Sequence, residues 1–150
     1  MFPKTLTLID DDQVYVDGLA GYLRGEGIVV STFADGRDFL AHPDPYGFNF
    51  YIADLMLPGI DGTELIKVLR MRTNAGVLVV SGRASADTFK EVIRAGADMY
   101  LTKPVVFEQV ALAIEAVHGE ELDRAIQDLT LAFRCTQAPA CRGFRYRRAG

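Results

Sequence analysis

Charged and hydroxyl side chains follow four short apolar runs of the sequence, at positions where predicted strands end. Asp10 and Asp11 follow the first run, Asp54 follows a later one, and Ser81 and Lys103 follow the last two. Several carboxylates in one place repel one another, so their ionised forms need a cation. Hard oxygen ligands suit Mg²⁺, and a lysine and a hydroxyl beside them complete a set that could bind a phosphoryl group. A carboxylate in such a set can itself act as the nucleophile and form an aspartyl phosphate.

Five short apolar runs alternate with amphipathic segments, and this alternation predicts the elements that must position those side chains. The predicted strands are 5–9, 28–33, 49–53, 76–81 and 98–101, and the predicted helices begin near residues 13, 35, 61, 85 and 107. Several strands are apolar without alternation, as expected when helices cover both faces of a parallel sheet. The sequence therefore predicts an α/β fold with a doubly wound, five-stranded parallel sheet. In such a sheet, ligands bind at the carboxyl ends of the strands.

The predicted first helix, residues 13–24, has apolar side chains at Val14, Leu19, Tyr22 and Leu23. Its two interior glycines disfavour the helix, so tertiary packing must support it. The second and third helices begin with acidic residues that can accept hydrogen bonds from the free backbone amides. These residues are Asp35 and Asp61.

Four motifs resemble those of the receiver domain of two-component response regulators. They are LTLIDDD at 6–12, ADLMLPGIDG at 53–62, VVSG at 79–82 and YLTKP at 100–104. The motifs occur in the family's order, and the resemblance covers roughly residues 4–118. It implies a flavodoxin-like receiver fold, and the D-x-x-x-P-G-x-D-G element after an apolar strand is its most specific part.

The resemblance implies a metal site and a phosphoacceptor. Asp54 corresponds to the phosphoacceptor, and Asp11 to the direct carboxylate ligand of Mg²⁺. Asp10 would act on the metal mainly through water and would hold Lys103. Asp54 would supply a second metal oxygen, and the backbone carbonyl of Met56 a third.

The resemblance also implies the residues that contact the phosphoryl group and respond to it. Lys103 would pair with the phosphoryl oxygens, and Ser81 would donate a hydrogen bond to them. Tyr100 would turn inward as Ser81 moves toward the phosphate. The peptide bond between Lys103 and Pro104 is often cis in this family. Val106 stands where a capping Asp or Ser often precedes the last helix, so that helix start is expected to be weaker.

By this resemblance the chain is a phosphorylation-controlled switch. A sensor histidine kinase or a phosphotransfer protein would donate a phosphoryl group to Asp54. The chain would assist its own modification without turning over a separate substrate, so it is not expected to be an enzyme in the usual sense. Phosphorylation would shift a two-state equilibrium and so control an output, including transcription regulation, or a partner.

Two further partners can be considered from the sequence, a second copy of the chain and a nucleic acid. A homodimer is possible through the last helices, or through the face formed by the fourth helix, fifth strand and fifth helix. Leu112 stands where the winged-helix subfamily often has an arginine that forms dimer salt bridges, which argues against the usual dimer of that subfamily. Nucleic acid would be bound only through an output region that the sequence does not make evident.

Two other classes of protein compete with this interpretation. Asp10 and Asp12 form a D-x-D pattern after a strand, as in haloacid-dehalogenase-like phosphohydrolases with an aspartate nucleophile. The later acidic pair of that family is not evident, and the pattern leaves the loop after Asp54 unexplained. A non-catalytic interaction module on the same fold would be expected to have lost one of the acidic pair, Asp54 or Lys103, and all are present.

Length and composition limit the remaining classes. The chain has 150 residues, of which 49% are hydrophobic and 24% charged, and its formal net charge is -4. These values exclude a disordered, collagen-like or disulfide-scaffold protein. No run approaches the roughly 20 apolar residues of a membrane helix, and the N-terminus does not resemble a signal peptide. The sequence therefore predicts a cytoplasmic protein without a membrane partner.

The sequence divides into three predicted parts. Residues 1–118 form the receiver domain, residues 119–133 an amphipathic helical extension or linker, and residues 134–150 a basic, disordered tail. The tail contains five of the 16 basic residues and no acidic residue. It also holds Cys135 and Cys141, whose spacing lacks a metal-binding or redox pattern.

Overall fold

A computed structural model of the protein describes residues 1–83 and 85–119, and it confirms the predicted α/β fold. The strands are β1 (Thr5–Ile9), β2 (Val29–Phe33), β3 (Phe50–Ala53), β4 (Gly76–Ser81) and β5 (Met99–Thr102). The helices are α1 (Gln13–Gly25), α2 (Gly36–Leu40), α3 (Gly62–Arg72), α4 (Ala86–Ala95) and α5 (Phe107–His118). Residues 120–150, with most of the predicted extension, the basic tail and both cysteines, lie outside the described residues.

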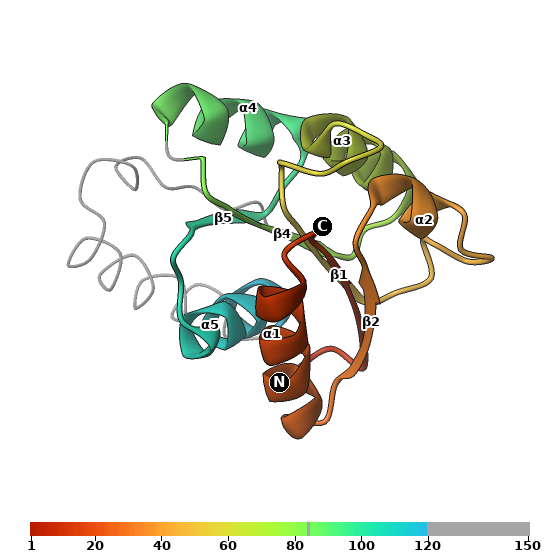
Figure 1. Ribbon diagram of the computed structural model, residues 1–150, viewed down its shortest axis with the longest axis vertical. Helices are drawn as coiled ribbons and strands as arrows, with labels where there is room; N and C mark the ends of the chain where they lie inside the picture. The colour runs from red at the N-terminus through yellow and green to blue at the C-terminus, as the bar shows by residue number, and fades with distance from the viewer. Residues whose placement is uncertain (84, 120–150) are drawn as a thin grey trace.

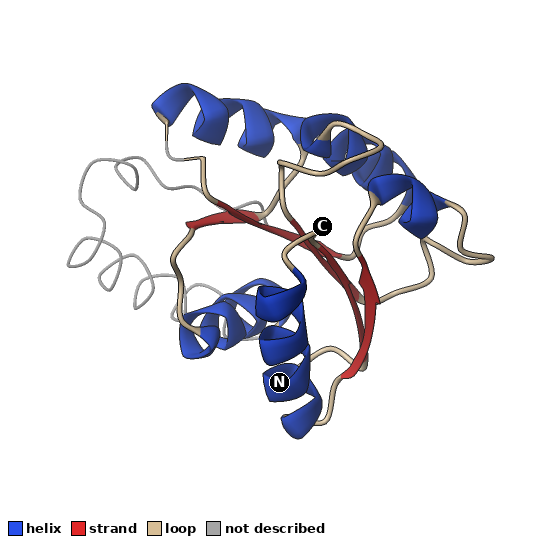
Figure 2. Cartoon of the chain, in the orientation of Figure 1, coloured by secondary structure: helices blue, strands red, loops and turns tan. Residues whose placement is uncertain are grey.

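The five strands form one parallel sheet in the order β2-β1-β3-β4-β5. Helices α1 and α5 cover one face of the sheet, while α2, α3 and α4 cover the other (Figure 1). Figure 2 shows the sheet between the two helical layers. Successive strand residues point to opposite faces, so Phe50 and Ile52 join one core while Tyr51 and Ala53 join the other. Burial on both faces explains why the strands are apolar without alternation. Within the described part of the chain, none of the helices has the length and apolar character needed to cross a bilayer.

The buried stripe of helix α1 includes only some of the apolar positions that the sequence analysis named. Its buried side chains are Val16, Leu19, Ala20 and Leu23. This spacing of three and four residues defines one face of a helix. Val14, one of the apolar positions of this helix, lies on the opposite face and is 85% exposed. Tyr22 flanks the stripe and packs against Phe107 of α5 at 6.0 Å between ring centroids.

A buried network around Arg70 connects α3 to the amino-terminal ends of β4 and β5. The guanidinium donates to the Asp98 carboxylate at 2.8 Å and to the carbonyls of Gly96 and Ala75 at 2.9 and 3.1 Å. The same Asp98 oxygen accepts the amide of Val77 at 2.9 Å. Each of these groups therefore has a partner away from water, which satisfies the buried charge and the loop carbonyls together.

Acidic side chains cap the helices that the sequence predicted them to cap. Asp35 accepts the amide of Arg37 at 2.7 Å, and Asp61 accepts the amide of Thr63 at 2.8 Å. Helix α5 differs, because Val106 precedes it and no side chain caps its first turn among the described residues. This agrees with the weaker start expected there.

Replacing Val106 with serine is expected to stabilise the fold by about 1 kcal/mol, the usual contribution of a helix cap. Val106 is 60% exposed, so the change sacrifices little apolar burial. The urea midpoints of Val106→Ser and Val106→Ala measure the effect, with alanine as the control for loss of the valine side chain. A serine variant no more stable than the alanine variant would contradict the prediction.

Candidate phosphoryl and metal site at the carboxyl edge of the sheet

Backbone hydrogen bonds continue the sheet one residue past three strands and so position the predicted site residues. The amide of Asp10 donates to the Phe33 carbonyl at 3.0 Å, and the amide of Asp54 donates to the Ile9 carbonyl at 2.9 Å. The amide of Lys103 donates to the Ser81 carbonyl at 2.8 Å. Strand order reverses at β1, whose neighbours are β2 and β3. The two acidic residues therefore lie where ligands bind in sheets of this kind.

Three of the predicted carboxylates come together at this edge. Asp10, Asp11 and Asp54 each offer an oxygen, and these atoms lie within 4.8 Å of one another. Asp10 and Asp54 are buried, while Asp11 is exposed. Asp12, the third acid of the run, instead caps α1 by accepting the amide of Tyr15 at 3.2 Å. The first two acids are therefore the pair that faces the site.

The Lys103 ammonium lies between the two buried carboxylates. Its Nζ is 2.7 Å from Asp10 Oδ2 and 3.2 Å from Asp54 Oδ2. The formal charges of three carboxylates and one ammonium sum to two negative charges at this edge. A divalent cation would neutralise them, and three carboxylate oxygens are hard ligands of the kind that Mg²⁺ binds. The residues present therefore fit a magnesium ion.

Burial and ion pairing act on the pKa values of this site in different ways. Burial raises the pKa of the Asp10 carboxyl, and the hydrogen bond from Lys103 only partly offsets that effect. Burial alone would lower the pKa of Lys103, but the hydrogen bond to Asp10 and the charges of Asp10 and Asp54 raise it instead. Lys103 is therefore held as a cation, while an ionised Asp10 is costly without a metal.

The raised pKa of Asp10 predicts how the metal-free protein responds to pH. Folded Asp10 binds its proton at a higher pH than it does in the unfolded chain, where the ordinary value is 3.8. Ionised Asp10 therefore opposes folding, and its cost disappears as pH falls through the raised pKa. Without metal, Asp10→Asn is expected to be more stable than the wild type at pH 7, by an amount that shrinks toward acid pH. Urea unfolding of both proteins between pH 7 and acid pH measures this stability difference. A difference that grows toward acid pH would contradict the prediction.

Ser81 and Tyr100 lie on the two strands beside the carboxylates. Ser81 is fully buried at the end of β4, and it pairs in register with Thr102, the residue before Lys103. Tyr100 is also buried, and its ring packs edge-on against Phe89 of α4 at 6.1 Å. Its hydroxyl donates a hydrogen bond to the Arg83 carbonyl. Tyr100 is thus turned inward here, and burial raises its pKa.

The loop after β3 contacts Asp54 through its backbone. The amide of Met56 donates to Asp54 Oδ1 at 3.1 Å, so each oxygen of this carboxylate has a partner. The Met56 side chain is exposed. Gly59 has φ +89°, a left-handed conformation that side chains disfavour. The role of the Met56 carbonyl as a metal ligand stays a prediction.

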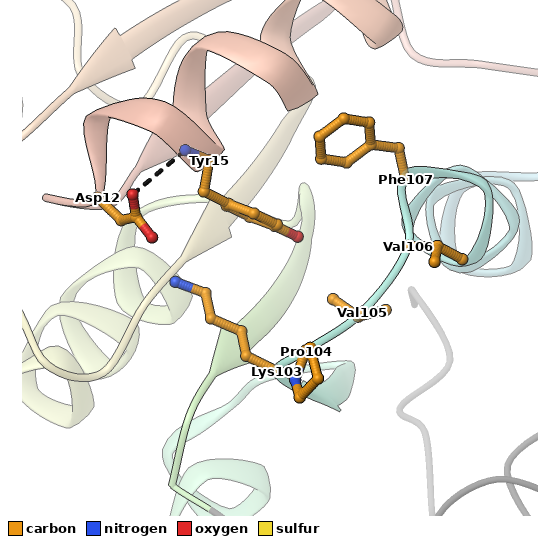
Figure 3. A pocket seen from close by; sticks show the side chains of 7 residues that line it. All are labelled: Asp12, Tyr15, Lys103, Pro104, Val105, Val106 and Phe107. Atoms are coloured by element: carbon orange, nitrogen blue, oxygen red, sulfur yellow. Dashed lines mark hydrogen bonds between the residues drawn. The ribbon is translucent and has the colours of Figure 1, made fainter.

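Sequence reasoning missed an aromatic residue of this site. Tyr15 of α1 lies with its ring centroid 4.8 Å from Lys103 Nζ. Both residues line a cavity of about 600 Å³, together with Asp12 and residues 104–107 of the loop into α5 (Figure 3). The peptide bond between Lys103 and Pro104 in this loop is cis, as the family resemblance suggested. No sequence pattern could have connected Tyr15 with Lys103, because the two residues are far apart in the sequence and meet only in the folded domain.

A parallel sheet in this order, with an acidic cluster and a lysine at its switch point, defines a flavodoxin-like α/β domain with a candidate cation site. Comparison with known families agrees with that class. The family model described as the response regulator receiver domain matches residues 6–130. The chain therefore belongs to the response regulator receiver family, and it contains a signalling domain of two-component systems.

Individual relatives have the same domain. The sensory transduction protein RegX3 of Mycobacterium tuberculosis is 35% identical over 126 residues, which are 83% of this chain and 56% of RegX3. This chain thus spans about half the length of RegX3 and of the other curated relatives it matches. A CheY-like receiver domain protein of Methanospirillum hungatei is 30% identical with a TM-score of 0.71, covering 84% of this chain and 98% of that one.

A third relative carries a modified aspartate. It is a response regulator of Burkholderia pseudomallei whose structure contains a phosphorylated aspartic acid, a calcium ion and citrate. Its identity to this chain is 28% and its TM-score is 0.68, and the match covers 86% of this chain and 74% of that one.

Proposed function

We propose that this receiver domain accepts a phosphoryl group on Asp54, with Mg²⁺ held directly by Asp11 and Asp54 and mainly through water by Asp10. The observation that supports the proposal is the geometry at Asp54. Its carboxylate lies within reach of two other acids and within 3.2 Å of the Lys103 ammonium. A nucleophilic carboxylate, a cation site and a fixed positive charge are what phosphoryl transfer requires.

In the proposed step, an Asp54 oxygen attacks the phosphorus of a phosphohistidine on the partner. A phosphorus–oxygen bond forms and the phosphorus–nitrogen bond breaks, and the electron pair leaves with the imidazole, which takes a proton from water. Lys103 neutralises charge on the phosphoryl oxygens during transfer. Bound Mg²⁺ would supply further neutralisation of those oxygens. Asp10 orients Lys103 through its 2.7 Å hydrogen bond. Asp10 would also help to hold the metal, mainly through water, and the Met56 carbonyl would be a further ligand.

The response to phosphorylation is proposed to involve Ser81 and Tyr100. The Ser81 hydroxyl would donate to the phosphoryl group, and the inward position of Tyr100 would then be favoured. Tyr100 contacts Phe89 of α4, so its position affects the surface formed by α4 and β5. Such a local change in packing can bias the whole domain between two states.

The wider role is proposed from the family. A sensor histidine kinase or a phosphotransfer protein would donate the phosphoryl group in the cytoplasm, and the chain would turn over no separate substrate. The output would be a partner protein or an output region, including one that regulates transcription. A homodimer would use the last helices or the α4-β5-α5 face. The proposed divisions remain residues 1–118, 119–133 and 134–150.

Intact-mass measurement tests the proposal directly. The purified chain is incubated with Mg²⁺ and a small phosphodonor such as phosphoramidate. The expected result is a mass increase equal to one phosphoryl group, which is lost when a chelator replaces Mg²⁺. No increase with Mg²⁺ present, or the same increase in the chelator, would overturn the proposal.

A further inference from the structure

The ring of Tyr15 forms a third contact of the Lys103 ammonium. Nζ lies 4.8 Å from the ring centroid, inside the distance at which a cation is attracted to an aromatic face. Its other two contacts are the carboxylates of Asp10 and Asp54. The ammonium therefore contacts two acids and one ring, and the ring comes from the first turn of α1.

The Tyr15 ring is held in place by an aromatic cluster between α1 and α5. Tyr15 packs edge-on against Phe107 at 5.7 Å, and Phe107 also contacts Tyr22. Phe107 lies against the α1 backbone at Gly18, where an added Cβ would come within 2.8 Å of the Phe107 ring. The Phe107 ring is therefore packed closely against α1, and it supports the side of the Tyr15 ring that faces away from Lys103.

Among the described residues, the hydroxyl group of Tyr15 makes no hydrogen bond that would account for a tyrosine at this position. It is buried, and within the described part of the chain it has no hydrogen-bond partner. A buried hydroxyl without a partner is a cost to folding. The contacts that the structure does give Tyr15 are made by the ring, to Lys103 on one side and to Phe107 on the other.

The cavity beside Lys103 leaves room for other conformations of its side chain. This space of about 600 Å³ is bordered by Tyr15, Lys103 itself and residues 104–107, as Figure 3 shows. A lysine has a flexible four-carbon stem and adopts many rotamers. Attraction to the ring face favours the rotamers in which the ammonium stays beside the carboxylates.

We propose that Tyr15 is a positioning residue for phosphoryl transfer, and that its ring face confines the Lys103 ammonium beside Asp54. This inference rests on the proposed function, because it assumes that Lys103 assists uptake at Asp54. Tyr15 touches neither the phosphoryl group nor the metal in this role. It acts only through Lys103.

Replacements at position 15 separate the ring from the hydroxyl. With Mg²⁺ and phosphoramidate, Tyr15→Phe and Tyr15→Trp are expected to keep the initial rate of mass gain. Tyr15→Leu is expected to lower it about three- to tenfold, the range of a partly exposed cation–π contact. A perfluorinated phenylalanine keeps the ring shape but reverses its quadrupole, so it should resemble leucine. A phenylalanine variant as slow as leucine, or a perfluorinated variant as fast as phenylalanine, would overturn the inference.

A proton NMR measurement does not depend on uptake. An aromatic face shifts the resonances of a group that lies over it, so the Cε protons of Lys103 are expected upfield in wild type and Tyr15→Phe. They should return to ordinary lysine values in Tyr15→Leu. Unshifted Lys103 resonances in the wild type would overturn the inference, even if the leucine variant failed to fold.

Two controls distinguish this inference from the proposed function. Tyr46→Leu removes the other ring that faces a cation in the described residues, Arg72 at 5.6 Å, and should leave uptake unchanged. An equal loss of rate in Tyr46→Leu would mean a general packing effect and would overturn the role of Tyr15. Asp54→Asn tests the proposed function itself. Loss of uptake in Asp54→Asn, with equal rates in Tyr15→Leu and Tyr15→Phe, would retain the proposed function and reject the positioning role.

Discussion

Asp54→Asn is expected to abolish the mass increase that the wild-type chain shows with Mg²⁺ and phosphoramidate. The amide has nearly the shape of the carboxylate but cannot form an acyl phosphate. Asp10 and Asp11 remain in this variant, and Lys103 keeps its 2.7 Å contact with Asp10. The loss would therefore come from the missing nucleophile rather than from collapse of the site.

The same variant discriminates between the classes that the sequence left open. A phosphohydrolase with its nucleophile in the D-x-D pattern at Asp10 would keep turnover in Asp54→Asn, and released phosphate would reveal it. An interaction module without phosphoryl chemistry would show no mass increase in the wild type. Asp38→Asn is the matched control, because Asp38 is an exposed acid of α2 outside the cluster and should leave uptake unchanged. Undiminished uptake in Asp54→Asn would reject Asp54 as the phosphoacceptor.

Arg70→Met is expected to lower the free energy of unfolding by about 3 kcal/mol, as found when one partner of a buried ion pair is removed. The Asp98 side chain is 3% exposed and that of Arg70 is 14% exposed, so water replaces the lost contacts poorly. The variant also deprives the carbonyls of Gly96 and Ala75 of their donor. Stabilities of this class of domain are about 5–15 kcal/mol, so the loss is a large fraction of the total.

Lys67 provides the control within the same helix. It pairs with Glu64 at 3.2 Å, but the two side chains are 54% and 61% exposed. An exposed pair contributes little, so Lys67→Met is expected to change stability by less than about 0.5 kcal/mol. The loss of stability in Arg70→Lys should lie between those of Arg70→Met and Lys67→Met. Lysine keeps the positive charge but lacks the planar guanidinium, which donates several hydrogen bonds in fixed directions. Equal urea midpoints for Arg70→Met and Lys67→Met would contradict a structural role for the Arg70 network.

The positions of the site residues could be predicted because strand ends are recognisable in the sequence. Apolar runs that end in Asp10, Asp54, Ser81 and Lys103 imply buried strands, and parallel strands bring their carboxyl ends to one edge. The apolar residues of α1 were harder to place. Val14 is apolar but lies opposite the stripe that contains Leu19, and composition alone does not reveal on which side of a helix the core will lie.

The sequence by itself therefore determined the fold class, the alternation of strands and helices, and the set of charged residues at the strand ends. These depend on local patterns of burial, which short segments carry in their own residues. Only the tertiary structure decided the strand order, the position of the Tyr15 ring beside Lys103, and the Arg70 network. Each of these depends on contacts between segments that are distant in the chain, and the geometry of such contacts exists only once the helices pack on the sheet.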